Sequence, residues 1–226
     1  MSAVSAPATI PAAERLRMIE VYASVQGEST FVGLPCVFVR LAGCNLRCTW
    51  CDSVWTFTGG VHRSIDDVVE EACAFGIDLV EVTGGEPLVH KQAIPLMERL
   101  VARGKTVLLE TSGSRDIGPV PPEVHVILDL KPPDSGEVAS NLWSNIPKLR
   151  QKDEVKVVIA SRRDYEWARE AVRAHGLIDR CAVLFSPAFG HVDPKDIVDW
   201  ILADGLRVRF QLQLHKFVWP PDQRGV

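Results

Sequence analysis

The 226-residue chain lacks the features that mark membrane, secreted and nucleic-acid-binding proteins. It has no uninterrupted apolar run of membrane-spanning length, about 20 residues. It does not begin with the basic start and apolar middle of a signal peptide. Its net charge of -4 disfavours nucleic acid and anionic membranes as main partners. We therefore expect a cytoplasmic protein with no nucleic-acid partner and no membrane partner, in a compartment that keeps cysteines reduced.

Repeats, low-complexity tracts and domain linkers are also missing from the sequence. Residues 1–16 are rich in alanine, serine and proline and indicate a flexible leader. The remainder, 17–226, is long enough to bury a substantial core, and its 46% hydrophobic content is ordinary for a globular protein. We predict a single domain over residues 17–226.

Short β-branched runs alternate with segments of helical period along this domain. The predicted strands are 37–42, 79–83, 106–110, 124–130, 155–159, 182–185 and 208–213. The predicted helices are one capped by Ser64 and ending near Gly76, two at 92–103 and 164–175, and one opening at Asp193 and Pro194. Such alternation predicts an α/β fold with a parallel sheet, and the units are too few for a full eight-fold barrel of about 250 residues. We expect an incomplete (β/α) barrel of about six to seven parallel strands.

Polar segments follow five of the predicted strands. They read GCNLRCTWCDS, TGGEP, ETSGS, DLKPP and SPAFG. The carboxyl ends of parallel strands meet at one edge of the sheet, where active sites of such folds gather. The sequence therefore predicts an active site at this edge.

Three cysteines, Cys44, Cys48 and Cys51, stand in a C-x3-C-x2-C pattern directly after the first predicted strand. Three thiolates can hold three irons of a [4Fe–4S] cluster and leave the fourth iron open to an exchangeable ligand. A structural zinc site completed by His62 is the alternative. The remaining cysteines, at positions 36, 73 and 181, have apolar neighbours and are expected to be small buried hydrophobes.

With Trp50 before the last cysteine, this pattern resembles the cluster motif of the radical S-adenosylmethionine (SAM) superfamily. The TGGEP segment is similar to the Gly-Gly-Glu segment of that superfamily. A glycine lets main chain approach a ligand closely, so Gly84 and Gly85 are expected to bond the amino and carboxylate ends of SAM. Alone, the segment would also suit a turn that enters a helix.

Further segments resemble the 7-carboxy-7-deazaguanine synthase family. They are VQGES at 25–29, FVRLAGCN at 38–45, CDS at 51–53, KPP at 131–133 and QLQLHKF at 211–217. The resemblance implies a carbon–nitrogen lyase that converts 6-carboxy-5,6,7,8-tetrahydropterin to 7-carboxy-7-deazaguanine in queuosine biosynthesis. It implies ring contraction with loss of ammonia, SAM used catalytically, a homodimer and a flavodoxin-like electron donor.

The resemblance also implies which residues bind the pterin. They are Val25, Gln26, Gly27, Glu28, Arg40, Thr83, Gln213 and His215. Arg40 lies within a predicted core strand, where a guanidinium needs an anion, either the substrate carboxylate or an internal acidic partner. Glu28 and Gln26 suit the aminopyrimidinone edge, or simply a polar turn. Thr83 could bond the pterin or cap the following segment.

For SAM the resemblance implies a second set of residues. They are Trp50, Cys51, Asp52, Gly85, Glu86, Ser112, Asp129, Leu130 and Lys131. Many members of the family have Ser-Pro-Lys where this chain has Asp-Leu-Lys, so Asp129 could bond ribose hydroxyls or pair with Lys131. Ser53 replaces the usual threonine ligand of Mg²⁺, and a hydroxyl with waters and substrate oxygens suits that ion.

The C-terminal segment extends past the usual family end as VWPPDQRGV. Gln211 and Gln213 alternate with leucines, so both should face the barrel interior if residues 208–213 form a strand. We expect residues 211–216 to line the pterin site and residues from Trp219 onward to cover it, a disordered tail being the alternative.

The sequence leaves two other functions open. A glycyl-radical activating enzyme shares the short radical SAM core, but it has no reason to keep Arg40 inside the barrel. A zinc-stabilised binding module without catalysis is the alternative from another class.

Overall fold

The computed structural model describes residues 14–226, so most of the predicted leader lies outside the described residues. Its strands are β1 (Arg15–Val25), β2 (Pro35–Leu41), β3 (Val61–Ser64), β4 (Leu79–Gly84), β5 (Thr106–Thr111), β6 (His125–Leu130), β7 (Glu154–Ile159), β8 (Ala182–Pro187) and β9 (Arg209–Phe210). Its α-helices are α1 (Ile65–Ala74), α2 (Ala93–Ala102), α3 (Arg162–Ala174), α4 (Leu177–Arg180), α5 (Pro194–Asp204) and α6 (His215–Val218). Within the described residues, no helix is both long and apolar enough to cross a membrane.

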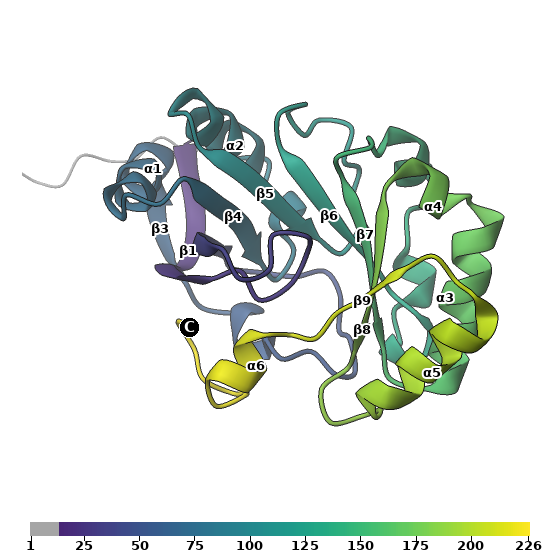
Figure 1. The fold of residues 1–226 in the computed structure, drawn as a ribbon. Coiled ribbons are helices and arrows are strands. Elements are labelled where there is room, and N and C mark those ends of the chain that lie inside the picture. Colours follow the sequence, from purple (N-terminus) through teal and green to yellow (C-terminus); the bar gives the residue numbers. More distant parts are fainter. Residues whose placement is uncertain (1–13) are drawn as a thin grey trace, which may run out of the picture.

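The strands form one nine-stranded sheet in the order β3-β1-β2-β4-β5-β6-β7-β8-β9. Every neighbouring pair from β2 to β9 is parallel, which gives seven parallel strands and confirms the predicted incomplete barrel. In the described part of the chain, β3 and β9 are the two outer strands of this order, so the sheet is curved but open (Figure 1).

The helices cover the outer face of the sheet, with α1 and α2 on one flank and α3 to α5 on the other (Figure 1). Their starts follow the predicted capping chemistry. The side chains of Ser64 and Asp193 accept hydrogen bonds from the main-chain N–H groups of Asp67 and Lys195. Helix α3 begins two residues earlier than predicted, because Ser161 accepts a bond from the N–H of Asp164 and acts as its N-cap. The apolar faces of these helices and the outward side chains of the strands form the main core.

The inner face of the sheet is layered along the strands. A small apolar cluster of Cys36, Phe38, Leu79, Leu108 and Ile127 lies nearest the amino ends of the parallel strands. Charged side chains follow two residues further along several strands, because alternate residues of a strand share a face. The interior is therefore sealed at one end by apolar packing and becomes polar towards the other.

Two strands were not expected from the sequence. β1 pairs antiparallel with β2, and β3 pairs antiparallel with β1. β1 begins at Arg15, inside the predicted leader. An antiparallel edge does not follow from a βαβ pattern, since it needs only a hairpin connection.

The prediction of a strand over residues 208–213 was wrong beyond Phe210. Residues 211–213 are irregular, and the chain then enters α6 at His215. From β9 the C-terminal segment runs back across the open side of the sheet to α6 (Figure 1). The alternation argument for Gln211 and Gln213 therefore does not hold.

Candidate active site

A cavity of about 600 Å³ opens on the inner side of the sheet. Its walls come from β1, β2, β4, β5, β6 and β7, from the loop after β2, and from residues 213–226. We call the part lined by Cys44, Cys48, Cys51, Gly85 and Ser112 the cysteine side. We call the part lined by Gln26, Glu28, Arg40, Glu110 and Lys156 the charged side.

The three predicted cluster cysteines all line the cavity and are unpaired thiols. Burial raises the pKa of each thiol above its ordinary value, and the pKa of Cys48 reaches about 11. Among the described residues, no three His, Cys, Asp or Glu side chains converge as a single metal ion would require. Each thiolate of a cubane binds a different iron, so a [4Fe–4S] cluster does not require the sulfurs to converge on one point.

The zinc alternative required His62 beside these cysteines. His62 is exposed on the edge strand β3, and it is not among the residues that line the cavity. The other cysteines are placed as expected: Cys36 and Cys181 are buried, and Cys73 packs partly buried against the core.

Gly84 and Gly85 allow β4 to lie directly against the cysteine loop. A Cβ on Gly85 would stand 2.7 Å from the Cβ of Cys44, and Gly84 has a φ of +143° that side chains avoid. The N–H of Gly85 donates to the carbonyl of Leu41 at 3.3 Å. Close approach is thus the reason for both glycines, but the partner seen here is the main chain of the cysteine loop. Their contact with SAM stays a prediction.

Glu86 is fully buried and does not line the cavity. Its carboxylate accepts hydrogen bonds from the hydroxyls of Thr111 and Ser112, from the N–H of Ser112 at 2.7 Å and from the N–H of Leu88 at 2.9 Å. The carboxylate therefore ties the end of β4 to the end of β5 and fixes Ser112 at the cavity wall. Glu86 therefore influences the site indirectly, by holding Ser112 in place.

Asp129 and Lys131 follow one another along the inner face and form an ion pair of 2.9 Å. Leu130 between them is 2% exposed and packs into the outer core. The Oδ1 atom of Asp129 is buried without a hydrogen-bond partner, while Oδ2 carries the ion pair. An unpaired buried acceptor at a cavity wall suits a ligand that donates hydroxyl hydrogens.

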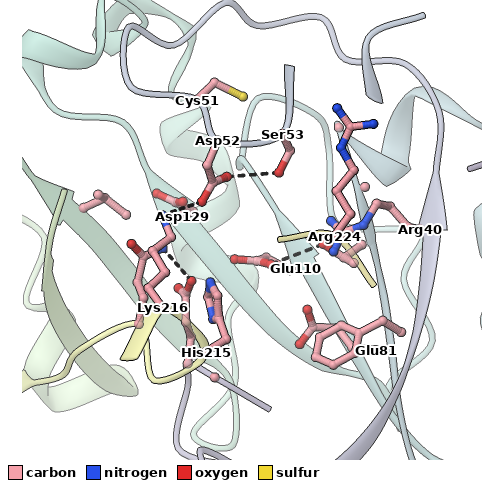
Figure 2. Close-up of a pocket in the computed structure, with 18 of the residues that line it drawn as sticks. Arg40, Cys51, Asp52, Ser53, Glu81, Glu110, Asp129, His215, Lys216 and Arg224 are labelled. Carbon is pink, nitrogen blue, oxygen red and sulfur yellow. Dashed lines mark hydrogen bonds and ion pairs between the residues drawn. The ribbon is translucent and has the colours of Figure 1, made fainter. Parts of the chain in front are cut away.

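Asp52 links the cysteine loop to α6. Its carboxylate lies 2.7 Å from the ammonium of Lys216 and accepts a 3.0 Å hydrogen bond from the Ser53 hydroxyl (Figure 2). Partial burial opposes ionisation, but Lys216 outweighs it and lowers the pKa of Asp52 to about 2. Ser53 lines the cavity, and its role as a Mg²⁺ ligand stays a prediction.

Arg40 has an internal partner, as the alternative interpretation required. Its Nε donates to Glu20 at 2.9 Å and its Nη2 donates to the Tyr22 hydroxyl at 2.7 Å. Glu20 and Tyr22 lie on β1, the strand that the sequence reasoning missed, and Glu20 stands opposite Arg40 in register. Arg40 also lines the cavity, so a substrate carboxylate could be a further partner.

Gln26 and Glu28 reach the cavity from the loop that follows β1. The side-chain amide of Gln26 donates to Glu81, and Glu28 accepts from the side-chain amide of Gln213 at 2.9 Å. Burial raises the pKa of Glu81 well above its ordinary value, and the nearby charge of Glu110 adds to this effect.

His215 packs on Gly27, where a Cβ would collide with the imidazole Nδ1. The carbonyl of Gly27 accepts a 2.9 Å hydrogen bond from the N–H of Leu214. This contact closes the start of α6 onto the loop after β1. Gly27 is thus required by the approach of two chain segments that are far apart in sequence.

Lys156 and Glu110 were not expected at the site. The ammonium of Lys156 contacts the carboxylates of Glu110 and Glu28, the second at 2.6 Å. Thr83 donates its hydroxyl to Glu110 at 3.2 Å. The available signal was the one used for Arg40: a charged residue between valines on a central strand, as in Glu154-Val-Lys-Val.

Residues 221–226 border the cavity opposite the strands. The guanidinium of Arg224 lies 4.6 Å from the centre of the Trp55 ring, and that of Arg40 lies 5.5 Å from the same ring. Both arginines are on one side of Glu110 in Figure 2, and Lys216 and His215 are on the other. The arrangement agrees with a covering tail, whose function stays a prediction.

Most residues that the sequence assigned to pterin, SAM or metal therefore line one cavity, with Glu86 and Leu130 the exceptions. Among residues 211–216, the lining residues are Gln213, His215 and Lys216, and Gln211 is not one of them. The thiols, the tight glycine pair and the unpaired Asp129 oxygen fit a [4Fe–4S] cluster with SAM.

Residues 39–135 match the model of the Radical SAM superfamily. The chain is 48% identical to a 7-carboxy-7-deazaguanine synthase of Koribacter versatilis over 93% of this chain and 100% of that one. It is 42% identical to the synthase of that name from Chlorobaculum tepidum, over 93% and 97% of the two chains. The structure of QueE from Escherichia coli superposes with a TM-score of 0.74 at 23% identity, covering 89% of this chain and 95% of that one.

The two synthases and the QueE structure match 89–93% of this chain, whereas the superfamily model matches its residues 39–135. The superfamily match confirms the prediction of a [4Fe–4S] cluster and SAM as cofactors. It leaves no support for a zinc-stabilised binding module, and the named relatives do not favour a glycyl-radical activating enzyme. The chain belongs to the radical SAM superfamily and, within it, to the family of 7-carboxy-7-deazaguanine synthases.

Proposed function

We propose that this chain converts 6-carboxy-5,6,7,8-tetrahydropterin to 7-carboxy-7-deazaguanine with loss of ammonia, as a carbon–nitrogen lyase in queuosine biosynthesis. The observation that carries the proposal is the single cavity in which three cysteines stand opposite a set of paired charges. Full-length relatives at up to 48% identity support the same reaction.

When bound, the cluster and SAM supply the electron and the 5′-deoxyadenosyl radical that removes hydrogen from C6 of the pterin. Cys44, Cys48 and Cys51 would hold the cluster, and Asp129, Lys131 and Ser112 would orient SAM against it. The pairing of Asp129 with Lys131 leaves Oδ1 free as an acceptor, which supports a bond from a ribose hydroxyl.

The charged side suits the pterin. Glu28 would accept two N–H bonds from the aminopyrimidinone, because a carboxylate can take a parallel pair. Arg40, fixed by Glu20 and Tyr22, would present its remaining N–H groups to the substrate carboxylate. These anchors hold the C6 hydrogen towards the cysteine side and hold the substrate for rearrangement.

The chain would also exclude water from the cavity. The apolar cluster around Phe38 closes one end of the interior, and residues 221–226 border the other. A radical held in such a site is shielded from side reactions. Ser53, beside the ionised Asp52, would bind Mg²⁺ through its hydroxyl, with waters and substrate oxygens filling the octahedron.

The proposal includes partners and a location. A flavodoxin-like electron donor would reduce the cluster, and the active form would be a homodimer. We place the reaction in the cytoplasm, since reduced thiols and a reduced cluster need a reducing compartment.

Anaerobic reconstitution with iron and sulfide, followed by reductant, SAM, Mg²⁺ and the tetrahydropterin, tests the reaction. The expected product is 7-carboxy-7-deazaguanine, identified by mass and absorbance, with ammonia released in equal amount. A protein with a full cluster that cleaves SAM but leaves the pterin unchanged would contradict the proposal.

A further inference from the structure

Lys156 is the most buried cation at the cavity. It lies on β7 between Val155 and Val157, which pack into the outer core, so its own side chain points to the inner face. Its exposed fraction is 4%. A lysine so enclosed needs anionic partners, because burial of an unpaired ammonium is strongly unfavourable.

Three carboxylates from three separate elements surround this ammonium. Glu28 comes from the loop after β1 and lies at 2.6 Å, Glu110 comes from β5, and Asp129 comes from β6 at 3.7 Å. Asp129 stands opposite Lys156 in register, which fixes their separation. Lys156 is therefore the point where the charged side meets the residues beside the cysteines.

Other cations near the cavity already form ion pairs with other carboxylates. Lys131 pairs with Asp129 at 2.9 Å, and Arg40 pairs with Glu20. Within residues 14–226, Lys156 is the cation in salt-bridge contact with Glu28 and Glu110. Removing it would leave two neighbouring, partly buried carboxylates without this counter-ion, and one of them would take up a proton.

We propose that Lys156 is a positioning residue for the pterin: its ammonium, in contact with Glu28 and Glu110, holds the Glu28 carboxylate where it can accept the N–H groups of the aminopyrimidinone edge. The inference rests on the proposed function, since the pterin is the ligand. It assigns to Lys156 a role in substrate affinity and not merely in folding.

The electrostatics of the site support this role. Burial alone would raise the pKa of Glu110, but Lys156 outweighs burial and lowers it to about 2. Burial alone would lower the pKa of Lys156, yet Glu110, Glu28 and Asp129 raise it well above the ordinary value. Lys131 and Arg40 also lower the pKa of Glu110, whereas burial, and then the charge of Glu110, raises the pKa of the neighbouring Glu81 well above its ordinary value.

The test is the pH dependence of pterin affinity in the anaerobic holoenzyme with SAM bound. In the unaltered protein, the dissociation constant should change little from about pH 6.5 to about pH 9, because the Lys156 ammonium stays in contact with both carboxylates. In Lys156→Met, a proton shared by Glu28 and Glu110 should compete with the N–H groups of the pterin for the Glu28 carboxylate. Affinity should fall at least about tenfold at pH 7 and recover by up to about tenfold per pH unit as the pH rises.

Lys195→Met is the matched control, since Lys195 is exposed on α5 and pairs with Asp199. It should behave as the unaltered protein. A Lys156→Met protein whose affinity falls equally at every pH, or does not fall, would overturn the inference. If Lys156→Met does not fold, Lys156→Met with Glu110→Gln removes one charge of each sign. The pterin affinity of this double variant should rise with pH as in Lys156→Met, but the rise should occur at lower pH. An affinity that does not change with pH would again overturn the inference.

Failure of the inference is distinct from failure of the proposed function. If the unaltered protein neither binds nor converts the pterin, the proposed function itself is wrong. If it does both and only the pH profile of Lys156→Met stays flat, Lys156 is a structural counter-ion.

Discussion

The two sides of the cavity are built by different means. The cysteine side consists of loops that follow β2, β4 and β5. It is held by the close packing of Gly85 on the loop at Cys44 and by hydrogen bonds from Ser112 to the Glu86 carboxylate. The charged side consists of side chains from strands and from the loop after β1, and ion pairs hold most of them. The difference teaches that the first side is sensitive to volume and backbone shape, whereas the second is sensitive to charge balance.

The largest effect is expected at the cysteine side. Cys48→Ala should abolish cluster assembly and SAM cleavage, because one of the three iron-binding thiolates is lost. Cys73→Ala is the control, since Cys73 packs against the core away from the cavity and should keep both activities. Iron and sulfide analysis after anaerobic reconstitution measures this. Full iron content with normal turnover in Cys48→Ala would break the assignment of this side.

Removal of a charge from the charged side should weaken pterin binding and leave SAM binding unchanged. Arg40→Met should weaken pterin binding by about 2–5 kcal/mol, the cost of truncating a charge-assisted pair. Titration calorimetry with each ligand separates the two affinities, and the exposed Arg173→Met serves as control.

Arg40→Met also leaves Glu20 unpaired, so a second variant is needed. In Arg40→Met with Glu20→Gln, the internal pair is removed as a unit. If Arg40 binds the substrate, the double variant should remain as weak as the single one. Recovery of pterin affinity in the double variant would mean that Arg40 serves only its internal partners.

Glu86 allows the contribution of the cysteine side to the stability of the fold to be measured. Glu86→Gln keeps the size of the side chain but sets an amide against buried N–H and hydroxyl donors. The free energy of unfolding of the apo-protein should fall by about 1–3 kcal/mol. Chemical denaturation measures this, with the exposed Glu98→Gln as the control. An unchanged midpoint would mean that the end of β5 does not depend on this carboxylate.

The smallest effect is expected at the tail. Deleting residues 219–226 should raise the KM for the pterin a few fold and increase SAM cleavage without product, because water exclusion is reduced. The ratio of 5′-deoxyadenosine to product reports the uncoupling. A truncated protein with unchanged kinetics and coupling would show that residues 221–226 border the cavity without covering it.

The same contrast explains what could be predicted from the sequence. The cysteine side is encoded in contiguous segments, so Cys44, Trp50 and Gly85 could be assigned from spacing and from the resemblance. Glu110 and Lys156 lie alone on strands, and their contact depends on register across the sheet, which no local pattern contains.

The fold shows the same limit. Capped helices and parallel strands have local signals, and Ser64 and Asp193 were read correctly. β1 is half-buried against two antiparallel partners and has no such signal, so Glu20 and Tyr22 were missed with it. The prediction for the end of the chain was wrong because its Gln-Leu alternation imitates a strand, while the Gln213 side chain donates to Glu28 and the N–H of Leu214 donates to the carbonyl of Gly27.

The central claim is that both sides of one cavity act on one substrate while SAM is retained. Turnover with SAM at one tenth of the pterin concentration tests it most directly. The account predicts that 7-carboxy-7-deazaguanine accumulates well beyond the amount of SAM, with little free 5′-deoxyadenosine. Product that never exceeds the SAM supplied, or 5′-deoxyadenosine formed while the pterin is untouched, would contradict it.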